Sequence, residues 1–311
     1  GWPLDFKAPT GGRSMATLSS DNGKTWTKPR TIVDLPMDDS PKGLLRCQDG
    51  TLLCFMNVQA SWYGYRKAPP ELAHVLSGLN TQQCVIRSVD NGKTWTEPYY
   101  FHSPGKFYDR SHAQAIQLPE GAILWPTYSN DLGKLFGVIR RSDDSGKTWR
   151  IISTIHRRDK HVDEPAIAHF SDGQLIVVCR PDGGTFRSDD EGYNWSQVGQ
   201  FVVDKGKFKA PWMTVLSDDT VVCVATLGHL RAWLSTDRGS SWTEPISLDP
   251  SCYGYPGGFK LEDESIITSY VERGAGKSRI FAIRFKVNDA RDGIELLPLG
   301  EYTFDPDIDK E

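Results

Sequence analysis

The chain has 311 residues, with 36 basic and 40 acidic side chains and a net charge of -4. These charges are spread along the sequence without a polybasic run or an acidic tail, so they give no support for nucleic-acid or membrane-surface binding. No apolar run approaches the roughly 18 residues that a membrane helix needs, and no basic and apolar leader follows Gly1. We therefore expect a soluble chain without a membrane span.

The six cysteines do not indicate a disulfide scaffold in a chain of this length, and none of their spacings matches a zinc site. Three of them lie within apolar segments, at Cys54, Cys179 and Cys223. We expect buried thiols that pack as small hydrophobic residues, and we predict neither a metal nor a cofactor. The redox compartment stays open.

One motif, Ser-x-Asp-x-Gly-x-x-Trp, recurs along the chain. Its five copies occupy residues 19–26, 88–95, 142–149, 188–195 and 235–242. Gly permits a positive φ, Ser and Asp cap the backbone of a turn, and Trp packs back into the core. The copies start 69, 54, 46 and 47 residues apart, which is a spacing typical of propeller blades.

A second repeat, a hairpin of two apolar strands, lies between the copies of the motif. The five hairpins contain Leu44, His112, Pro165, Trp212 and Gly258 in their first strands. A third strand runs into each motif and a fourth leaves it, which gives four antiparallel strands per blade. We predict an all-β, six-bladed propeller that forms one domain over residues 1–311. Its N-terminal blade is incomplete, or is completed by residues 293–304, and five blades is the alternative.

Strand direction predicts where the unusual residues gather. Because neighbouring strands are antiparallel, every first strand starts, and every second strand ends, on the face opposite the repeated motifs. The candidates at first-strand starts are Asp109, Arg110, His112, Asp163, Glu164, Trp212 and Tyr255, and those at second-strand ends are Asn57, Tyr128, Arg180 and Glu272. Such a convergence at a channel mouth predicts a site for a polar ligand, either anionic or hydroxylated.

The repeated motif resembles the Asp-box of the sialidase superfamily, and the likeness runs from about residue 13 to 285. The resemblance implies an exo-acting glycoside hydrolase of an anionic sugar, with an oligosaccharide or glycoconjugate as substrate. In that family a tyrosine is the nucleophile, a glutamate is its base, an aspartate is the acid/base, and three arginines bind the substrate carboxylate. A neutral nucleophile avoids repulsion from that carboxylate.

The resemblance assigns roles to particular residues. Tyr255 resembles the nucleophile, Glu164 its base and Arg180 one of the arginines. Glu272 resembles a glutamate that orients an arginine. Arg231 lies in the blade that is expected to supply another arginine.

Two parts of the family pattern are missing. The Arg-Ile-Pro signature that delivers the first arginine is absent, and Arg13 and Arg46 are weak substitutes for it. No aspartate has a clear acid/base context, so Asp5, Asp38 and Asp39 are the candidates.

Three histidines near blade mouths, His112, His161 and His229, suggest another activity because a neutral imidazole transfers protons near pH 7. A lyase of uronic-acid polysaccharides centred on His112 and Tyr255, or another glycosidase, is the second hypothesis. A glycan-binding propeller without turnover is the third, since fold does not fix function. The aromatic-rich segment 60–70 is expected to wall the pocket. We expect a secreted or periplasmic protein, whose signal is absent from this chain.

Overall fold

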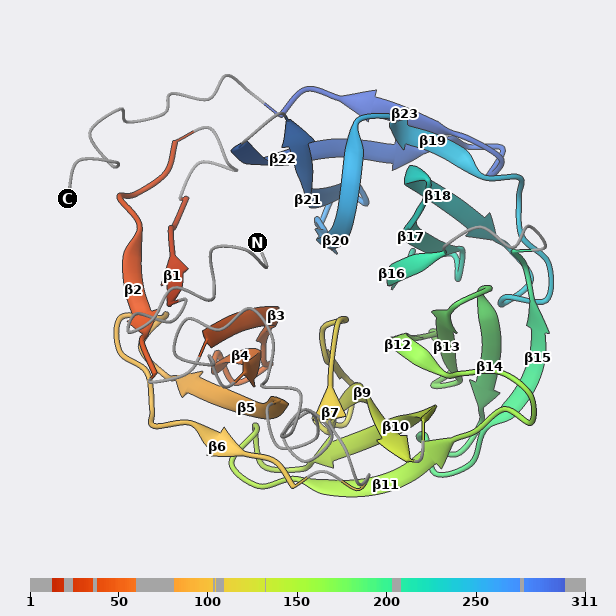
Figure 1. Cartoon of the computed structure of the whole chain (residues 1–311). Coiled ribbons are helices and arrows are strands. Elements are labelled where there is room, and N and C mark those ends of the chain that lie inside the picture. Colours follow the sequence, from red (N-terminus) through yellow and green to blue (C-terminus); the bar gives the residue numbers. More distant parts are fainter. Residues whose placement is uncertain are drawn as a thin grey trace, which may run out of the picture.

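A computed structural model describes residues 13–19, 25–35, 38–59, 81–102, 104, 109–131, 133–202, 208–274 and 277–299. These residues contain strands and turns and no helix. None of them belongs to a helix that is long and apolar enough to cross a membrane. The sheets stand around a central axis as the blades of a propeller (Figure 1), so the predicted all-β propeller is confirmed.

Five blades follow one another around the ring in the described part of the chain. From the innermost strand outward, blade 1 has β3 (Asp38–Arg46), β4 (Leu52–Gln59), β5 (Thr81–Ser88) and β6 (Tyr99–Tyr100). Blade 2 has a divided inner strand, β7 (Asp109–Arg110) and β8 (Ile116–Gln117), then β9 (Ile123–Asp131), β10 (Lys134–Ser142) and β11 (Arg150–Ile155). Blade 3 has β12 (Asp163–His169), β13 (Leu175–Arg180), β14 (Gly184–Ser188) and β15 (Ser196–Gln200).

The last two blades repeat this order. Blade 4 has β16 (Lys209–Val215), β17 (Val221–Leu227), β18 (His229–Ser235) and β19 (Ile246–Asp249), and blade 5 has β20 (Cys252–Lys260), β21 (Ile266–Gly274), β22 (Lys277–Val287) and β23 (Ile294–Leu297). A two-stranded sheet of β1 (Ser14–Ala16) and β2 (Arg30–Val33) stands between blade 5 and blade 1 (Figure 1).

The described residues form five full blades, which is the alternative count that the sequence predicts. The β1–β2 sheet stands where the sequence predicts an incomplete N-terminal blade. Strand β23 pairs with β22, so residues 294–297 are the outer strand of blade 5 and do not complete the N-terminal blade. Residues 300–304 lie outside the described residues.

The strand registers define two faces of the propeller. In blade 3, Asp163 at the start of β12 pairs with Arg180 at the end of β13, whereas Leu175 at the start of β13 pairs with Ser188 of the Asp-box motif. The inner-strand starts therefore lie at one end of the blade, which we call the mouth face. The motifs lie at the other end, the Asp-box face, as the sequence predicts.

Each described Asp-box turn is held by the side chains that its motif specifies. In the 88–95 copy, Ser88 Oγ accepts a hydrogen bond from the Gly92 N–H at 2.8 Å, and Asp90 accepts one from the Thr94 N–H at 2.9 Å. The Trp95 indole donates to the Gly92 carbonyl at 3.2 Å, and Gly92 has a φ of 76°. The copies at 142, 188 and 235 repeat these bonds. The element therefore has a structural role.

The hydrophobic core is divided among the blade interfaces. One cluster joins blades 3 and 4 around Trp233, another joins blades 4 and 5 around Phe285, and a third joins blades 1 and 2 around Trp125. Arginines add links on the Asp-box face: Arg87 donates to the Ser145 carbonyl of the next blade at 2.9 Å. The ring thus positions the inner strands relative to one another.

All six cysteines are buried and unpaired, as the sequence predicts. Burial raises the pKa of the Cys54 and Cys179 thiols to about 12. Because only the thiolate is nucleophilic, we expect no cysteine of the native protein to react with Ellman's reagent at pH 8, and six to react after unfolding in guanidinium chloride. Rapid labelling of the native protein would contradict this packing.

Candidate active site

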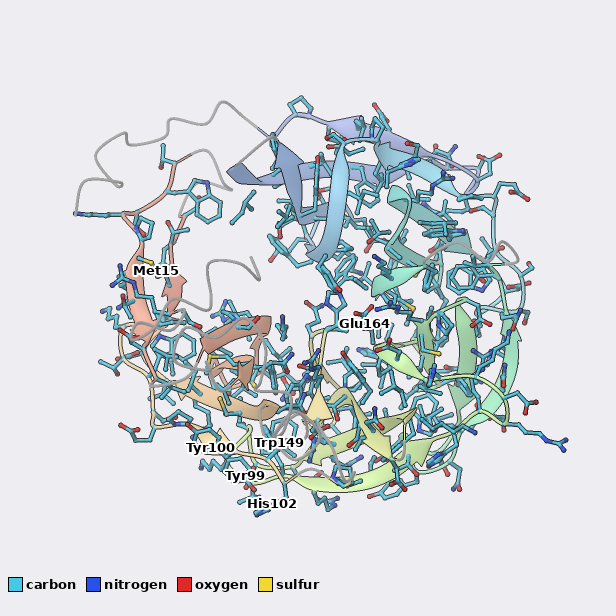
Figure 2. The ribbon with its side chains drawn as sticks, in the orientation of Figure 1. Met15, Tyr99, Tyr100, His102, Trp149 and Glu164 are labelled. Atoms are coloured by element: carbon cyan, nitrogen blue, oxygen red, sulfur yellow. The ribbon has the colours of Figure 1, made fainter. Side chains whose placement is uncertain are left out.

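One position of the inner strand supplies the central residues of the mouth. In blades 2 to 5, the turn between the first and second strands opens at Leu118, Phe170, Leu216 and Leu261, respectively. The position in question lies six residues before this turn residue. In the same order, this position holds His112, Glu164, Ala210 and Tyr255. Because the blades are arranged around a common axis, equivalent positions converge on that axis. Figure 2 shows Glu164 at the inner edge of its blade.

The backbone is irregular at this position. The pairing of β12 with β13 shifts between Asp163 and Ala166, and Glu164 has a φ of 48°. Ala210 at the equivalent position of blade 4 has a φ of 54°. Each of these residues precedes a proline, which offers no N–H to the sheet. Bulges and positive φ at residues other than glycine are frequent at functional sites, where they redirect a side chain.

Glu164 is held at both carboxylate oxygens. Glu164 is buried, with 4% of the residue exposed. Oε1 accepts a hydrogen bond from Arg180 Nη1 at 3.3 Å, and Oε2 accepts one from the Ala210 N–H of the next blade at 2.7 Å. The second bond ties blade 3 to blade 4, so the orientation of this carboxylate depends on the closed ring.

Arg180 brings two carboxylates together. The same Nη1 lies 3.5 Å from Asp163 Oδ2, and the side chains of Arg180, Asp163 and Glu164 are 32%, 16% and 5% exposed. Burial would lower the pKa of Arg180, but the charges of Glu164 and Asp163 and the phenols of Tyr255 and Tyr128 outweigh it and raise that pKa. The guanidinium therefore stays charged beside two tyrosines.

His112 contacts Tyr255 across the mouth. Their ring centroids are 5.2 Å apart with an interplanar angle of 63°, an edge-to-face arrangement. His112 is buried, and its Nε2 has no hydrogen-bond partner among the described residues. Burial lowers the pKa of His112 to about 4; the charge of Glu164 opposes this and that of Lys42 adds to it. A neutral imidazole thus lies beside the phenol of Tyr255, which is 49% exposed.

Cations from three blades surround this centre. Lys42 of β3 acts electrostatically on His112, Arg110 of β7 acts on Asp163, and Arg180 ends β13. Two of these cations, Arg110 and Arg180, act on Asp163, and Arg180 also pairs with Glu164. Among the described side chains, three cations stand against two carboxyl groups, a balance that favours an anionic ligand because a cleft with an excess of one charge concentrates ions of the other.

Three candidate residues are placed away from this centre. Asp109 is 1% exposed and forms a buried ion pair with Arg140. Trp212 is 2% exposed and lies in the core between blades 4 and 5. Arg231 lies on β18, the third strand of blade 4, opposite Ala225. We do not include these residues in the proposed site.

Other candidates are engaged elsewhere or face the other way. His161 Nδ1 accepts a hydrogen bond from the Leu135 N–H at 3.0 Å, and His229 Nε2 lies 3.0 Å from Ser247 Oγ. Arg46 ends β3 on the Asp-box face, so it cannot substitute for an arginine of the mouth.

The strands place four of the remaining candidates. Arg13 immediately precedes β1 in the incomplete N-terminal sheet. Glu272 lies on β21 opposite Cys252, and Asp38 and Asp39 lie on β3, but the side chains of all three are outside the description. Asp5 and segment 60–70 lie outside the described residues.

Sequence reasoning missed two groups of this site, the Lys42 ammonium and the Ala210 N–H. Lys42 was missed because the first hairpin was assigned from Leu44 onward, whereas β3 begins at Asp38. Ala210 has no reactive side chain, so no list of candidate side chains includes it. In blades 3, 4 and 5 the equivalent residue precedes a proline, as Glu164, Ala210 and Tyr255 do. This shared proline is the sequence signal that could have identified the equivalent positions.

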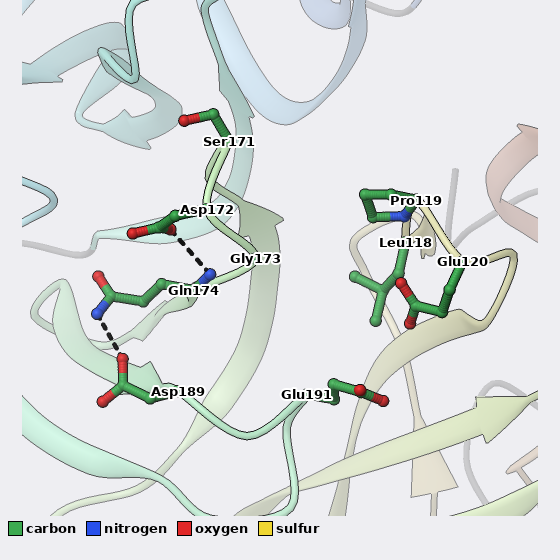
Figure 3. A pocket seen from close by; sticks show the side chains of 9 residues that line it. All are labelled: Leu118, Pro119, Glu120, Ser171, Asp172, Gly173, Gln174, Asp189 and Glu191. Carbon is green, nitrogen blue, oxygen red and sulfur yellow. Dashed lines mark hydrogen bonds between the residues drawn. The ribbon is translucent and has the colours of Figure 1, made fainter.

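A separate pocket of about 470 Å³ lies on the Asp-box face (Figure 3). Four acidic side chains line it: Glu120, Asp172, Asp189 and Glu191. Its carboxylates would repel an anionic sugar, and it contains no histidine or tyrosine.

Within the described part of the chain, no group of three or more His, Cys, Asp or Glu side chains could hold a metal ion. We therefore place the candidate active site at the mouth face.

The repeat pattern also identifies the family. A family model described as the BNR repeat-like domain matches residues 44–267. The chain belongs to this family. A xyloglucanase of Paenibacillus sp. is 24% identical over an alignment of 266 positions, which covers 76% of this chain and 24% of the xyloglucanase. A sialidase of Bacteroides fragilis is 24% identical over an alignment of 199 positions, which covers 58% of this chain and 36% of that protein. The chain spans well under half the length of either relative.

Several solved structures share the fold of this chain. A Dyadobacter fermentans protein of unknown function has a TM-score of 0.71 and 22% identity, and the match covers 89% of this chain and 84% of that one. A Hadza microbial sialidase has a TM-score of 0.68 and 19% identity over 87% of this chain and 59% of that one. Trypanosoma rangeli sialidase in complex with the inhibitor DANA has a TM-score of 0.63 and 16% identity, covering 89% and 50%. At these identities the likeness shows the fold alone.

The pKa of Asp163 gives a prediction for stability. Burial, followed by the charge of Glu164, raises that pKa from 3.8 to about 7, with Arg180 and Arg110 opposing. A raised carboxyl pKa stabilises the folded protein at low pH, and this contribution is lost as the pH rises from about 4 to about 7. The stability of Asp163→Asn relative to wild type should therefore increase between these pH values in urea titrations. A constant difference would contradict the raised pKa.

Proposed function

We propose that the chain is a sialidase-like glycoside hydrolase that acts at the end of a glycan on an anionic sugar. The observation that carries the proposal is that Arg180 Nη1 lies 3.3 Å from Glu164 Oε1 and is also within electrostatic reach of Tyr255, all at the mouth face. The excess of cations among the described side chains of the mouth supports a substrate carboxylate. The sialidase and xyloglucanase names of the relatives agree with a carbohydrate substrate.

The geometry supports a division of roles. Arg180 would bind the substrate carboxylate. That contact would compete with Glu164 Oε1, whose bond to Arg180 is the longer of the two that Glu164 accepts. Glu164 would then be able to take the proton of Tyr255, while the Ala210 N–H keeps Oε2 in place. Tyr255 would attack the anomeric carbon as a phenolate.

Turnover of 4-methylumbelliferyl α-sialoside, followed by fluorescence, tests the proposal. Arg180→Lys keeps one charge but loses the planar fork that binds a carboxylate through two nitrogens. We expect it to raise KM by about ten-fold or more and to change kcat less. Arg158→Lys, at an exposed position of the same face, is the matched control and should behave as wild type. No turnover by the wild type would contradict the proposed hydrolase.

The contact between His112 and Tyr255 favours a second candidate, a lyase of uronic-acid polysaccharides. A neutral imidazole can abstract a proton next to a carboxylate, and a phenol can donate one to the leaving oxygen. The measurement is the ultraviolet absorbance of an unsaturated product during incubation with uronate polymers. If neither reaction occurs and the protein binds glycans on an array, it is a binding module.

A further inference from the structure

The arrangement of charges at the mouth assigns a role that the sequence leaves open. We propose that Asp163 is the proton donor of this site and protonates the glycosidic oxygen as the leaving group departs. This inference rests on the proposed hydrolase. It concerns a carboxyl group for which the resemblance to sialidases suggests no acid/base role.

The first observation is that Asp163 and Glu164 share one nitrogen. Arg180 Nη1 lies 3.5 Å from Asp163 Oδ2 and 3.3 Å from Glu164 Oε1. A single guanidinium cannot fully neutralise two buried carboxylates, so the site favours the state in which one of them keeps its proton.

The second observation is that their surroundings differ. Glu164 accepts a hydrogen bond from the Ala210 N–H at 2.7 Å, and an N–H donor stabilises the ionised form. The Asp163 side chain has the longer contact to Arg180 and is also influenced by the backbone N–H of Glu164, and it is three times more exposed than the Glu164 side chain, at 16% against 5%. When two neighbouring carboxyl groups differ in this way, one suits the acid role and the other the base role. The proton therefore belongs on Asp163, where a substrate can reach it.

The charged groups that act on Asp163 are Glu164 on its own strand, Arg180 on β13 and Arg110 on β7. Burial and the charge of Glu164 raise its pKa to about 7, against the opposing effect of the two arginines and of the Glu164 backbone N–H. A proton donor is most effective when its pKa lies near the working pH. The electrostatics thus agree with the geometry.

The reaction balances with the groups at hand. In the first step the bond from the anomeric carbon to the leaving oxygen breaks, and its electron pair stays on that oxygen, which takes the proton of Asp163. Tyr255 gives its proton to Glu164 and forms the new bond to the anomeric carbon. In the second step water attacks that carbon and gives a proton to the Asp163 carboxylate. The phenolic oxygen of Tyr255 leaves and recovers its proton from Glu164.

The kinetic test varies the leaving group. Asp163→Asn should lower kcat/KM for a sialyl-lactose, whose sugar alcohol needs a proton to leave, by about 10²–10⁴-fold. For the 4-methylumbelliferyl sialoside, whose phenol leaves as an anion, the loss should stay below about ten-fold. Asp159→Asn, an exposed aspartate of the same face, is the control. Equal losses on both substrates would overturn the proposal.

A second measurement does not depend on activity. Carboxyl ¹³C NMR of the wild type, with Asp163 assigned by its loss in Asp163→Asn, should give a titration midpoint well above the ordinary aspartate value, and Glu164→Gln should lower that midpoint. A midpoint at the ordinary aspartate value of about 4 would overturn the proton-donor role while leaving the hydrolase intact. Absence of turnover by the wild type with either glycoside would instead contradict the hydrolase, and the donation step with it.

Discussion

Tyr255→Phe is expected to abolish most of the proposed hydrolase activity, with kcat/KM on the 4-methylumbelliferyl sialoside falling by a factor on the order of 10³ or more. The variant loses only the phenolic oxygen, which is the atom that would form the bond to the anomeric carbon. The ring remains, so its edge-to-face contact with His112 at 5.2 Å is preserved. The loss should therefore appear in kcat, with the fold and the binding of the substrate carboxylate retained.

The companion variant Glu164→Gln should lose about 10²–10⁴-fold, because the amide cannot take the phenolic proton. Tyr193→Phe is the matched control, since Tyr193 is also an exposed phenol (44%) but lies on the Asp-box face. Unchanged thermal melting of all three variants would show that the losses are chemical. Full activity of Tyr255→Phe would remove the nucleophile from the proposed mechanism.

His112→Phe separates the two candidate reactions. It keeps an aromatic ring against Tyr255 and removes the nitrogens that could transfer a proton. If the chain is a lyase, activity on a uronate polymer should disappear. If it is a hydrolase that uses Glu164 as base, sialoside turnover should fall far less than in Tyr255→Phe.

The repeat pattern predicts the fold well because its residues act locally. Ser88, Asp90, Gly92 and Trp95 close one turn through bonds within eight residues, so spacing alone locates the turn and the direction of the strands. The face that carries Glu164 and Arg180 follows from strand direction in the same way. For this reason the mouth face could be predicted without coordinates.

The contents of the site depend on interactions between blades, which spacing does not encode. Nothing near Asp109 in the sequence indicates that Arg140, 31 residues later, neutralises it in the core. The bond from the Ala210 N–H to Glu164 joins residues 46 positions apart. Trp212 follows a site position in the sequence but turns into the core, because its strand resumes regular pairing with Val224 after the bulge.

Arg140→Met is expected to destabilise the fold by about 3–5 kcal/mol, because it leaves the Asp109 carboxylate buried without its cation. The two side chains are 4% and 2% exposed, and Arg140 also donates to the His102 carbonyl at 3.0 Å and lies 4.9 Å from the centre of the Phe101 ring. Urea unfolding followed by tryptophan fluorescence measures the loss of stability.

The double variant Asp109→Leu/Arg140→Met should recover much of the lost stability, since an apolar pair of similar volume needs no desolvation of charge. Arg150→Met, which breaks an exposed ion pair with Asp143, should change stability little. If Arg140→Met were as mild as this control, the Asp109–Arg140 pair would not hold blade 2 together.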